Sequence, residues 1–95
     1  MNIGKAIIQL RVNKLRQSQM FFSKQIGITQ SYLSQIENGK KQPSTELLQK
    51  MATLLKTPLP ILFWFAINEN DVEESKIEHY RFIKPIIDKM IQSIF

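Results

Sequence analysis

Amide and hydroxyl side chains gather in one short stretch of the chain, from Gly27 to Gly39. Leu33 and Ile36 are three residues apart, so on a helix they point to the same side, the interior. The other sides of that helix carry Gln30, Ser31, Ser34 and Gln35. A glutamine side chain can pair bidentately with adenine in the major groove of DNA. The stretch is therefore a candidate surface for reading base edges.

The helices that position this surface are predicted by their caps. Thr29 can accept a backbone N–H of a first helical turn, and Gly39 suits the left-handed residue that follows a last turn. Together they predict a helix from Thr29 to Asn38. Ser18 can cap a preceding helix over residues 19–26, and the next glycine lets the backbone turn sharply between the two helices.

Apolar residues three and four apart predict four further helices and no strand. We expect these helices over residues 3–16, 44–55 and 59–67, and from near Asp71 to the end of the chain. Glu73 and Glu74 are expected in the first turn of the last helix, and Pro85 is expected to kink or divide it. Its apolar seam, spaced by 3, 4, 3 and 4 residues, is Tyr80, Ile83, Ile87, Met90 and Ile94.

The basic residues are unevenly placed along the chain. The 95 residues carry a net charge of +5. Residues 1–58 hold nine Lys and Arg against two acids (9 − 2 = +7), whereas residues 59–95 hold four against six (4 − 6 = −2). A basic half beside an acidic half predicts that the first half meets a polyanion. The length is that of one domain, and a core this small gains stability from dimerisation.

Several classes of protein and site are disfavoured by the composition. The chain has no cysteine, which excludes disulfides and cysteine-bound zinc and favours a reducing compartment. The longest apolar run, residues 59–67, is about half the ~20 residues that a membrane span needs, and the N-terminus lacks the apolar core of a signal peptide. We therefore expect a soluble, cytoplasmic protein.

Enzymatic chemistry is not predicted. The serines lack a base and an orienting acid in any motif, and His79 is the only histidine. There is no phosphate-binding glycine loop, and neither the carboxylates nor potential metal ligands have the spacing of a site. We expect no catalytic residue, no metal and no cofactor.

The chain resembles the phage repressor/Cro (XRE-type) helix-turn-helix family over roughly residues 3–67. The residues that carry the resemblance are Ser18-Gln19, Phe22-Ser23, Gly27-Ile28-Thr29, Leu33 to Gly39, Pro43-Ser44, Leu47 and Ala52. The resemblance implies an all-α, five-helix lambda-repressor-like domain that binds DNA, with a C-terminal helical extension beyond it.

Roles for individual residues follow from the resemblance. The positions that contact bases are Gln30, Ser31 and Gln35, with Tyr32 and Ser34 as further readers. The positions that contact phosphate are Gln19, Asn38 and Lys40, with Lys41 adjacent. The family residue at Gln19 also braces the base-reading residue at position 30. Glu37 matches a buried acid that pairs with an arginine of the first helix, and Arg11 is its candidate partner.

The sequence departs from the family pattern in three places. Arg16 stands where family members usually carry a glycine. Counting back from Gln19, the family arginine falls at Val12, so Arg11 is one residue early and the first helix has one extra residue near its end. The tail, residues 71–95, lies beyond the core domain.

The function that these observations predict is a sequence-specific DNA-binding regulator, most simply a repressor, that acts as a homodimer. Residues 1–67 would bind DNA, with half-sites about one helical turn (~34 Å) apart, and residues 68–95 would dimerise. The expected dimer contacts are Phe63, Trp64, Tyr80, Ile83, Ile87, Met90 and Ile94. An alternative is an antitoxin-like or accessory module whose residues 71–95 bind a partner protein, with DNA binding for autoregulation. A third is binding of nucleic acid by charge alone.

Overall fold

The computed structural model describes all residues, 1–95, and contains helices and turns but no strand. The six α-helices are α1 (Ile3–Gln9), α2 (Gln19–Ile26), α3 (Gln30–Glu37), α4 (Thr45–Leu54), α5 (Leu59–Ala66) and α6 (Ile77–Ile94). Three shorter elements are the π-helical turn η1 (Leu10–Lys14) and the 3₁₀ turns η2 (Glu69–Asp71) and η3 (Glu74–Lys76). The all-α prediction is confirmed.

Side-chain caps begin four of the helices at or near the expected positions. The backbone N–H groups of Lys5, Phe21, Tyr32 and Leu47 donate to the side chains of Asn2, Ser18, Thr29 and Ser44, respectively. Each cap satisfies a donor that the first turn of a helix leaves without an intrahelical partner. Gly27 and Gly39 both have the positive φ that was expected after α2 and α3.

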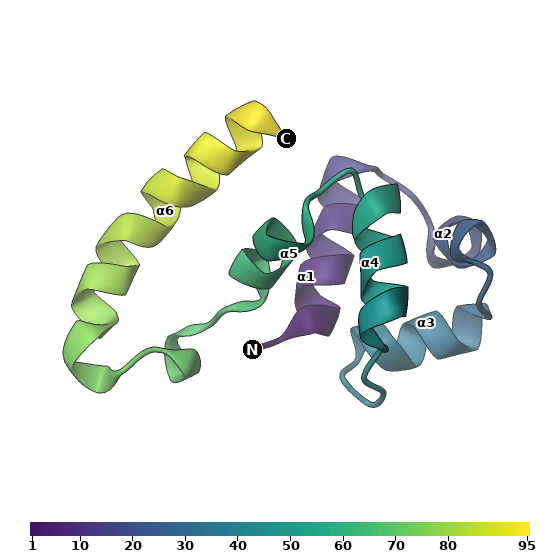
Figure 1. Cartoon of the computed structure of the whole chain (residues 1–95), viewed down its shortest axis with the longest axis horizontal. Coiled ribbons are helices and arrows are strands. Elements are labelled where there is room, and N and C mark those ends of the chain that lie inside the picture. The colour runs from purple at the N-terminus through teal and green to yellow at the C-terminus, as the bar shows by residue number, and fades with distance from the viewer.

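Helices α1 to α5 form a compact body around one core. Helix α1 packs against α5 and α3, α2 packs against α3 and α4, and α4 packs against α5 (Figure 1). Leu33 and Ile36 point into this core, as predicted, and Phe22 and Ile26 of α2 join them there. The other core residues are Ala6, Ile7, Leu10, Leu48, Met51, Ala52, Leu55, Leu62 and Ala66.

The first helix changes its winding where the sequence carries its extra residue. The N–H of Leu15 donates to the carbonyl of Leu10 at 3.1 Å, a bond that spans five residues in place of the usual four. Such a π turn accommodates one additional residue inside a helix. Arg16 follows with φ +53°, the left-handed conformation for which glycine is the ordinary choice.

The C-terminal helix begins later than the sequence predicted. We expected it to start near Asp71 with Glu73 and Glu74 in its first turn, but α6 starts at Ile77. A capping box between Asn68 and Asp71 begins the separate turn η2, and the extended backbone at Val72 then ends it. Helix α6 then runs through Pro85 without dividing.

Helix α6 stands beside α5 and is joined to the body by defined contacts (Figure 1). The indole N–H of Trp64 donates to Asp88 at 2.7 Å, and the Tyr80 hydroxyl donates to the Ile67 carbonyl at 3.1 Å. Arg81 donates two hydrogen bonds to Glu69, and these lower the pKa of the Glu69 carboxyl and raise the pKa of Arg81.

None of the helices is both long and apolar enough to cross a membrane.

Candidate nucleic-acid interface

A tight turn joins α2 to α3 and sets the direction of α3. Gly27, with φ +89°, ends α2, and the N–H groups of Gly27 and Ile28 both donate to the Ser23 carbonyl, at 2.9 and 3.0 Å. Ser23 is buried, so its small side chain lets the two helices approach closely. Thr29 then caps α3, which lies across one end of the body (Figure 1).

The predicted base-reading residues divide into two groups by exposure. Gln30 and Ser31, at the start of α3, are exposed. Tyr32, Ser34 and Gln35 are half-buried, and the Tyr32 ring packs against the core. The first turn of α3 therefore offers the freest amide and hydroxyl groups, at the end of the helix where backbone N–H groups and the dipole favour a negatively charged partner.

The loop after α3 is held by its backbone and presents its side chains outward. The N–H groups of Lys40 and Lys41 both donate to the Gln35 carbonyl, at 2.8 and 3.2 Å, while Gly39 takes φ +78°. The side chains of Asn38, Lys40 and Lys41 are exposed. Two ammonium groups on a constrained glycine turn are suited to contact phosphates and to fix an orientation without reading sequence.

A buried ion pair fixes the other end of α3. The Arg11 guanidinium donates from Nε to Glu37 Oε2 at 2.8 Å and from Nη2 to Oε1 at 3.0 Å. Arg11 and Glu37 are only 8% and 5% exposed. Arg11 also donates from Nη1 to the Gln17 carbonyl at 2.7 Å. The pair is bidentate and each of its charged atoms is hydrogen-bonded, which offsets the free energy that burying two charges costs.

Gln19 also takes part in this network, but its hydrogen-bond partner differs from the expected one. Its amide donates to Glu37 Oε1 at 2.8 Å, rather than bracing Gln30 at the start of α3. The carboxylate lies at the C-terminal end of α3, close to the first residue of α2, and an anionic acceptor forms the stronger hydrogen bond. Glu37 is therefore hydrogen-bonded to Arg11 in the π turn and to Gln19 of α2, and Arg11 extends the network to the loop before α2.

Two residues with contacts between distant segments were not singled out from the sequence: Gly4, beside α3, and Lys14, which joins η1 to the turn between α4 and α5. A Cβ built on Gly4 would lie 2.5 Å from the carbonyl oxygens of Ile36 and Glu37, so α1 crosses the end of α3 at a distance that only glycine permits. A glycine inside a helical pattern was the available signal. Lys14 donates to the Lys56 carbonyl and the Thr57 hydroxyl, and burial, followed by repulsion from Lys56, lowers its pKa.

The predicted dimer contacts fall on different sides of the chain. Trp64 and Tyr80 contact each other, with ring centroids 6.3 Å apart, and Phe63 packs against the core. Ile87 is half-buried, seven residues after Tyr80 on the same side of α6. Ile83, Met90 and Ile94 are exposed. The seam is thus split between a side that meets the chain's own body and a side open to solvent.

Comparison with known proteins agrees with this geometry. A helix-turn-helix family model matches residues 7–62, more than half of the chain. The "ImmF control region 10 kDa protein" of Bacillus phage phi105 is 39% identical over 61 residues, which cover 63% of this chain and 66% of the relative. The "Transcriptional regulator ClgR" of Mycobacterium tuberculosis is 46% identical over 35 residues, 37% of this chain and 31% of the relative.

No solved structure gives a significant match. The chain covers just under two thirds of the phage relative and about a third of the mycobacterial one. The family match includes the whole α2–turn–α3 unit and confirms the resemblance on which the site was predicted. This chain belongs to the XRE-type helix-turn-helix family of DNA-binding transcriptional regulators.

Proposed function

We propose that this protein is a cytoplasmic, sequence-specific repressor that binds a pseudo-palindromic operator as a homodimer. Helix α3 enters the major groove and the protein occludes a promoter. The residues that read bases are Gln30, Ser31, Tyr32, Ser34 and Gln35. The residues that contact phosphate are Gln19, Asn38, Lys40 and Lys41.

The observation that carries this proposal is how α3 is held. Its C-terminal end is fixed by the buried Arg11–Glu37 pair, whereas Gln30 and Ser31 at its other end are exposed. A rigid helix with free amide and hydroxyl groups can discriminate between bases, because its side chains lose little freedom on binding. The excess of positive charge in residues 1–58 supports the attraction of the phosphate backbone.

The two parts of the chain have different roles in this proposal. Residues 1–67 form the DNA-binding domain, which ends just beyond α5, and residues 68–95 form the extension that joins two copies. A homodimer would double the contacts with DNA, and its two-fold symmetry would match the symmetry of the operator.

Selection of bound duplexes from a random DNA pool, at stated salt, tests the proposal. A repressor of this kind enriches a consensus with two inverted half-sites. Binding by charge alone would give no consensus and a steep salt dependence. An enriched but asymmetric, single half-site would contradict the homodimer while leaving sequence reading intact.

A second candidate function is supported by the exposed apolar side of α6. Phe82, Met90 and Ile94 are 73, 59 and 71% exposed, a surface that an antitoxin-like or accessory module could use to bind a partner protein. In that case DNA binding would serve autoregulation. A toxin-like reading frame beside the gene would favour this function over the first.

A further inference from the structure

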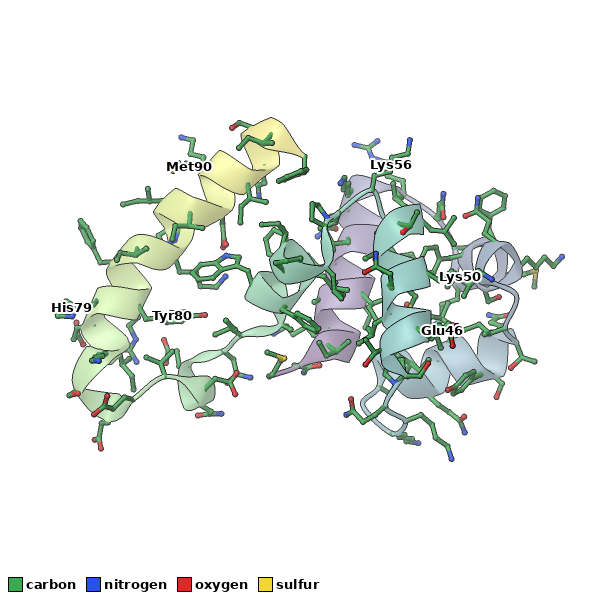
Figure 2. All side chains as sticks on the ribbon, in the orientation of Figure 1. Glu46, Lys50, Lys56, His79, Tyr80 and Met90 are labelled. Carbon is green, nitrogen blue, oxygen red and sulfur yellow. The ribbon has the colours of Figure 1, made fainter.

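An apolar stripe runs along the side of α6 that faces away from the body. At 100° per residue its members fall within one third of the helix circumference. They are Phe82, Ile83, Ile86, Met90 and Ile94, between 44 and 73% exposed. We name them the outer stripe. Figure 2 shows Met90 and His79 pointing away from the body and Tyr80 pointing toward it.

The opposite side of α6 is already occupied, so the outer stripe cannot turn inward without breaking those contacts. Asp88 accepts hydrogen bonds from Trp64 at 2.7 Å and from Lys84 at 2.8 Å. Tyr80 is bonded to the Ile67 carbonyl, and Ile91 is buried. The helix is thus held in one rotation about its axis, with the outer stripe in solvent.

We propose that the occupant of the outer stripe is α6 of a second copy of this chain, packed antiparallel. Covering five large apolar side chains on each of two copies, with the flanking residues of both helices, would remove on the order of 1,000 Å² from water, the threshold for a specific interface. Self-association needs only one surface to be complementary to itself. This inference rests on the proposed homodimer and assigns its interface to the outer stripe.

The charges beside the outer stripe select the antiparallel arrangement. Glu78 and Lys89 are eleven residues apart, close to three full turns, so both lie along the same border of the stripe. In an antiparallel pair with two-fold symmetry, that border meets the same border of the second copy. Each Glu78 then faces Lys89 of the other helix, and two attractive pairs form by symmetry. A parallel pair would bring this border against the opposite one, and neither pair could form.

The arrangement determines how far apart the two α3 helices lie. Helices α3 and α6 occupy opposite ends of the molecule, whose longest extent is 41 Å (Figure 1). The copies lie on opposite sides of the shared interface. The distance between their α3 helices is therefore nearly twice the longest extent of one copy. That separation suits half-sites two helical turns (~68 Å) apart, rather than one turn.

Engineered cysteines test the interface directly, because the natural chain has none. The pairing of Glu78 with Lys89 puts the two-fold axis near Ile83. We expect Ile83→Cys to form a disulfide-linked dimer under mild oxidation and Ile94→Cys to do so at least about 10-fold more slowly, since cross-linking needs Cα atoms within ~7 Å. Equal rates would overturn the antiparallel arrangement.

Sedimentation of the full chain measures the same contact without cross-linking. Ile86→Glu should weaken dimerisation by more than about 10-fold with unchanged helicity by circular dichroism. Gln92→Glu, on α6 but outside the outer stripe, is the matched control and should have no effect. A natural chain that stays monomeric at all accessible concentrations, or an Ile86→Glu variant that dimerises normally, would overturn the proposal.

Duplexes with two copies of the selected half-site at one, two and three turns then separate this inference from the proposed function. We expect tightest binding by the natural chain at two turns, and no dependence on spacing for Ile86→Glu. A preference for one turn overturns the α6 interface while sequence reading stands. Failure to enrich any half-site overturns the proposed function, and the cross-linking result still decides the interface.

Discussion

The Arg11 guanidinium forms a bidentate, buried ion pair with Glu37, although Arg11 comes one residue earlier than the family pattern places it. The π turn η1 accounts for this, because its five-residue hydrogen bond takes up the extra residue after Arg11. The pair joins the first helical segment to the end of the recognition helix. The winding of the first helix thus determines how α3 is held.

Glu37→Gln should lower the free energy of unfolding by about 3–5 kcal/mol, because it leaves the Arg11 charge buried without a counter-charge. Urea unfolding followed by circular dichroism measures this. Glu46→Gln, at an exposed acid of α4, is the control and should change the free energy by less than about 0.5 kcal/mol. A loss below about 1 kcal/mol for Glu37→Gln would mean that the pair is not a main anchor of α3.

Deletion of Val12 tests the role of the π turn. Val12 is exposed, and its removal restores the family spacing between Arg11 and Gln19. The π turn should become ordinary α-helix while Arg11 still reaches Glu37, so we expect the free energy of unfolding to change by only about 1 kcal/mol. Urea unfolding is again the measurement.

The matched control for the Val12 deletion is deletion of Gln49. Gln49 is also exposed, but it lies within the regular helix α4, where no π turn can take up the change. Its removal rotates the apolar residues that follow it by about 100° away from the core, so it should cost far more stability. Equal losses for the two deletions would contradict the role given to η1.

The sequence predicted the parts of this fold that depend on local chemistry. The caps Ser18 and Thr29 and the glycine turns after α2 and α3 were predicted correctly, because each acts on backbone groups within a few residues. The only sign of the π turn in the sequence was that Arg11 lies one residue earlier than the family pattern places the arginine. The start of α6 was predicted too early, because non-helical backbone at Val72 and Glu73 separates the short turn η2 from the helix that follows. The close approach at Gly4 was marked only by a glycine inside a helical pattern, which does not tell which distant segment comes near.

Gly4→Ala should destabilise the protein and weaken its binding to DNA together. The added Cβ meets two backbone carbonyls of α3, which cannot rotate away as a side chain can. Overpacking of this kind typically costs about 1–3 kcal/mol. Thermal unfolding and operator affinity are the two measurements, with Lys5→Ala as the exposed control on α1. Unchanged stability would show that α1 can shift away from α3 without cost.

Lys40→Ala should weaken binding to all DNA sequences alike and reduce the salt dependence of binding. Removing one phosphate contact lowers the slope of log K against log[salt] by about 1. The measurement is affinity for operator and random duplexes at several salt concentrations. Lys24→Ala, at an exposed lysine of α2 outside the loop, is the charge-matched control. An unchanged slope for Lys40→Ala would rule out its phosphate contact.

Gln30→Ala should instead weaken binding to the best site selectively, by about 1–3 kcal/mol, and relax the preference at one base pair. Gln30 is exposed in the first turn of α3, so the substitution leaves the core and the Arg11–Glu37 pair in place. The measurement is affinity for the selected operator and for operators changed one base pair at a time. Gln25→Ala, at an exposed glutamine of α2, is the matched control. Equal loss on operator and random DNA would show that Gln30 contributes to attachment and not to base reading.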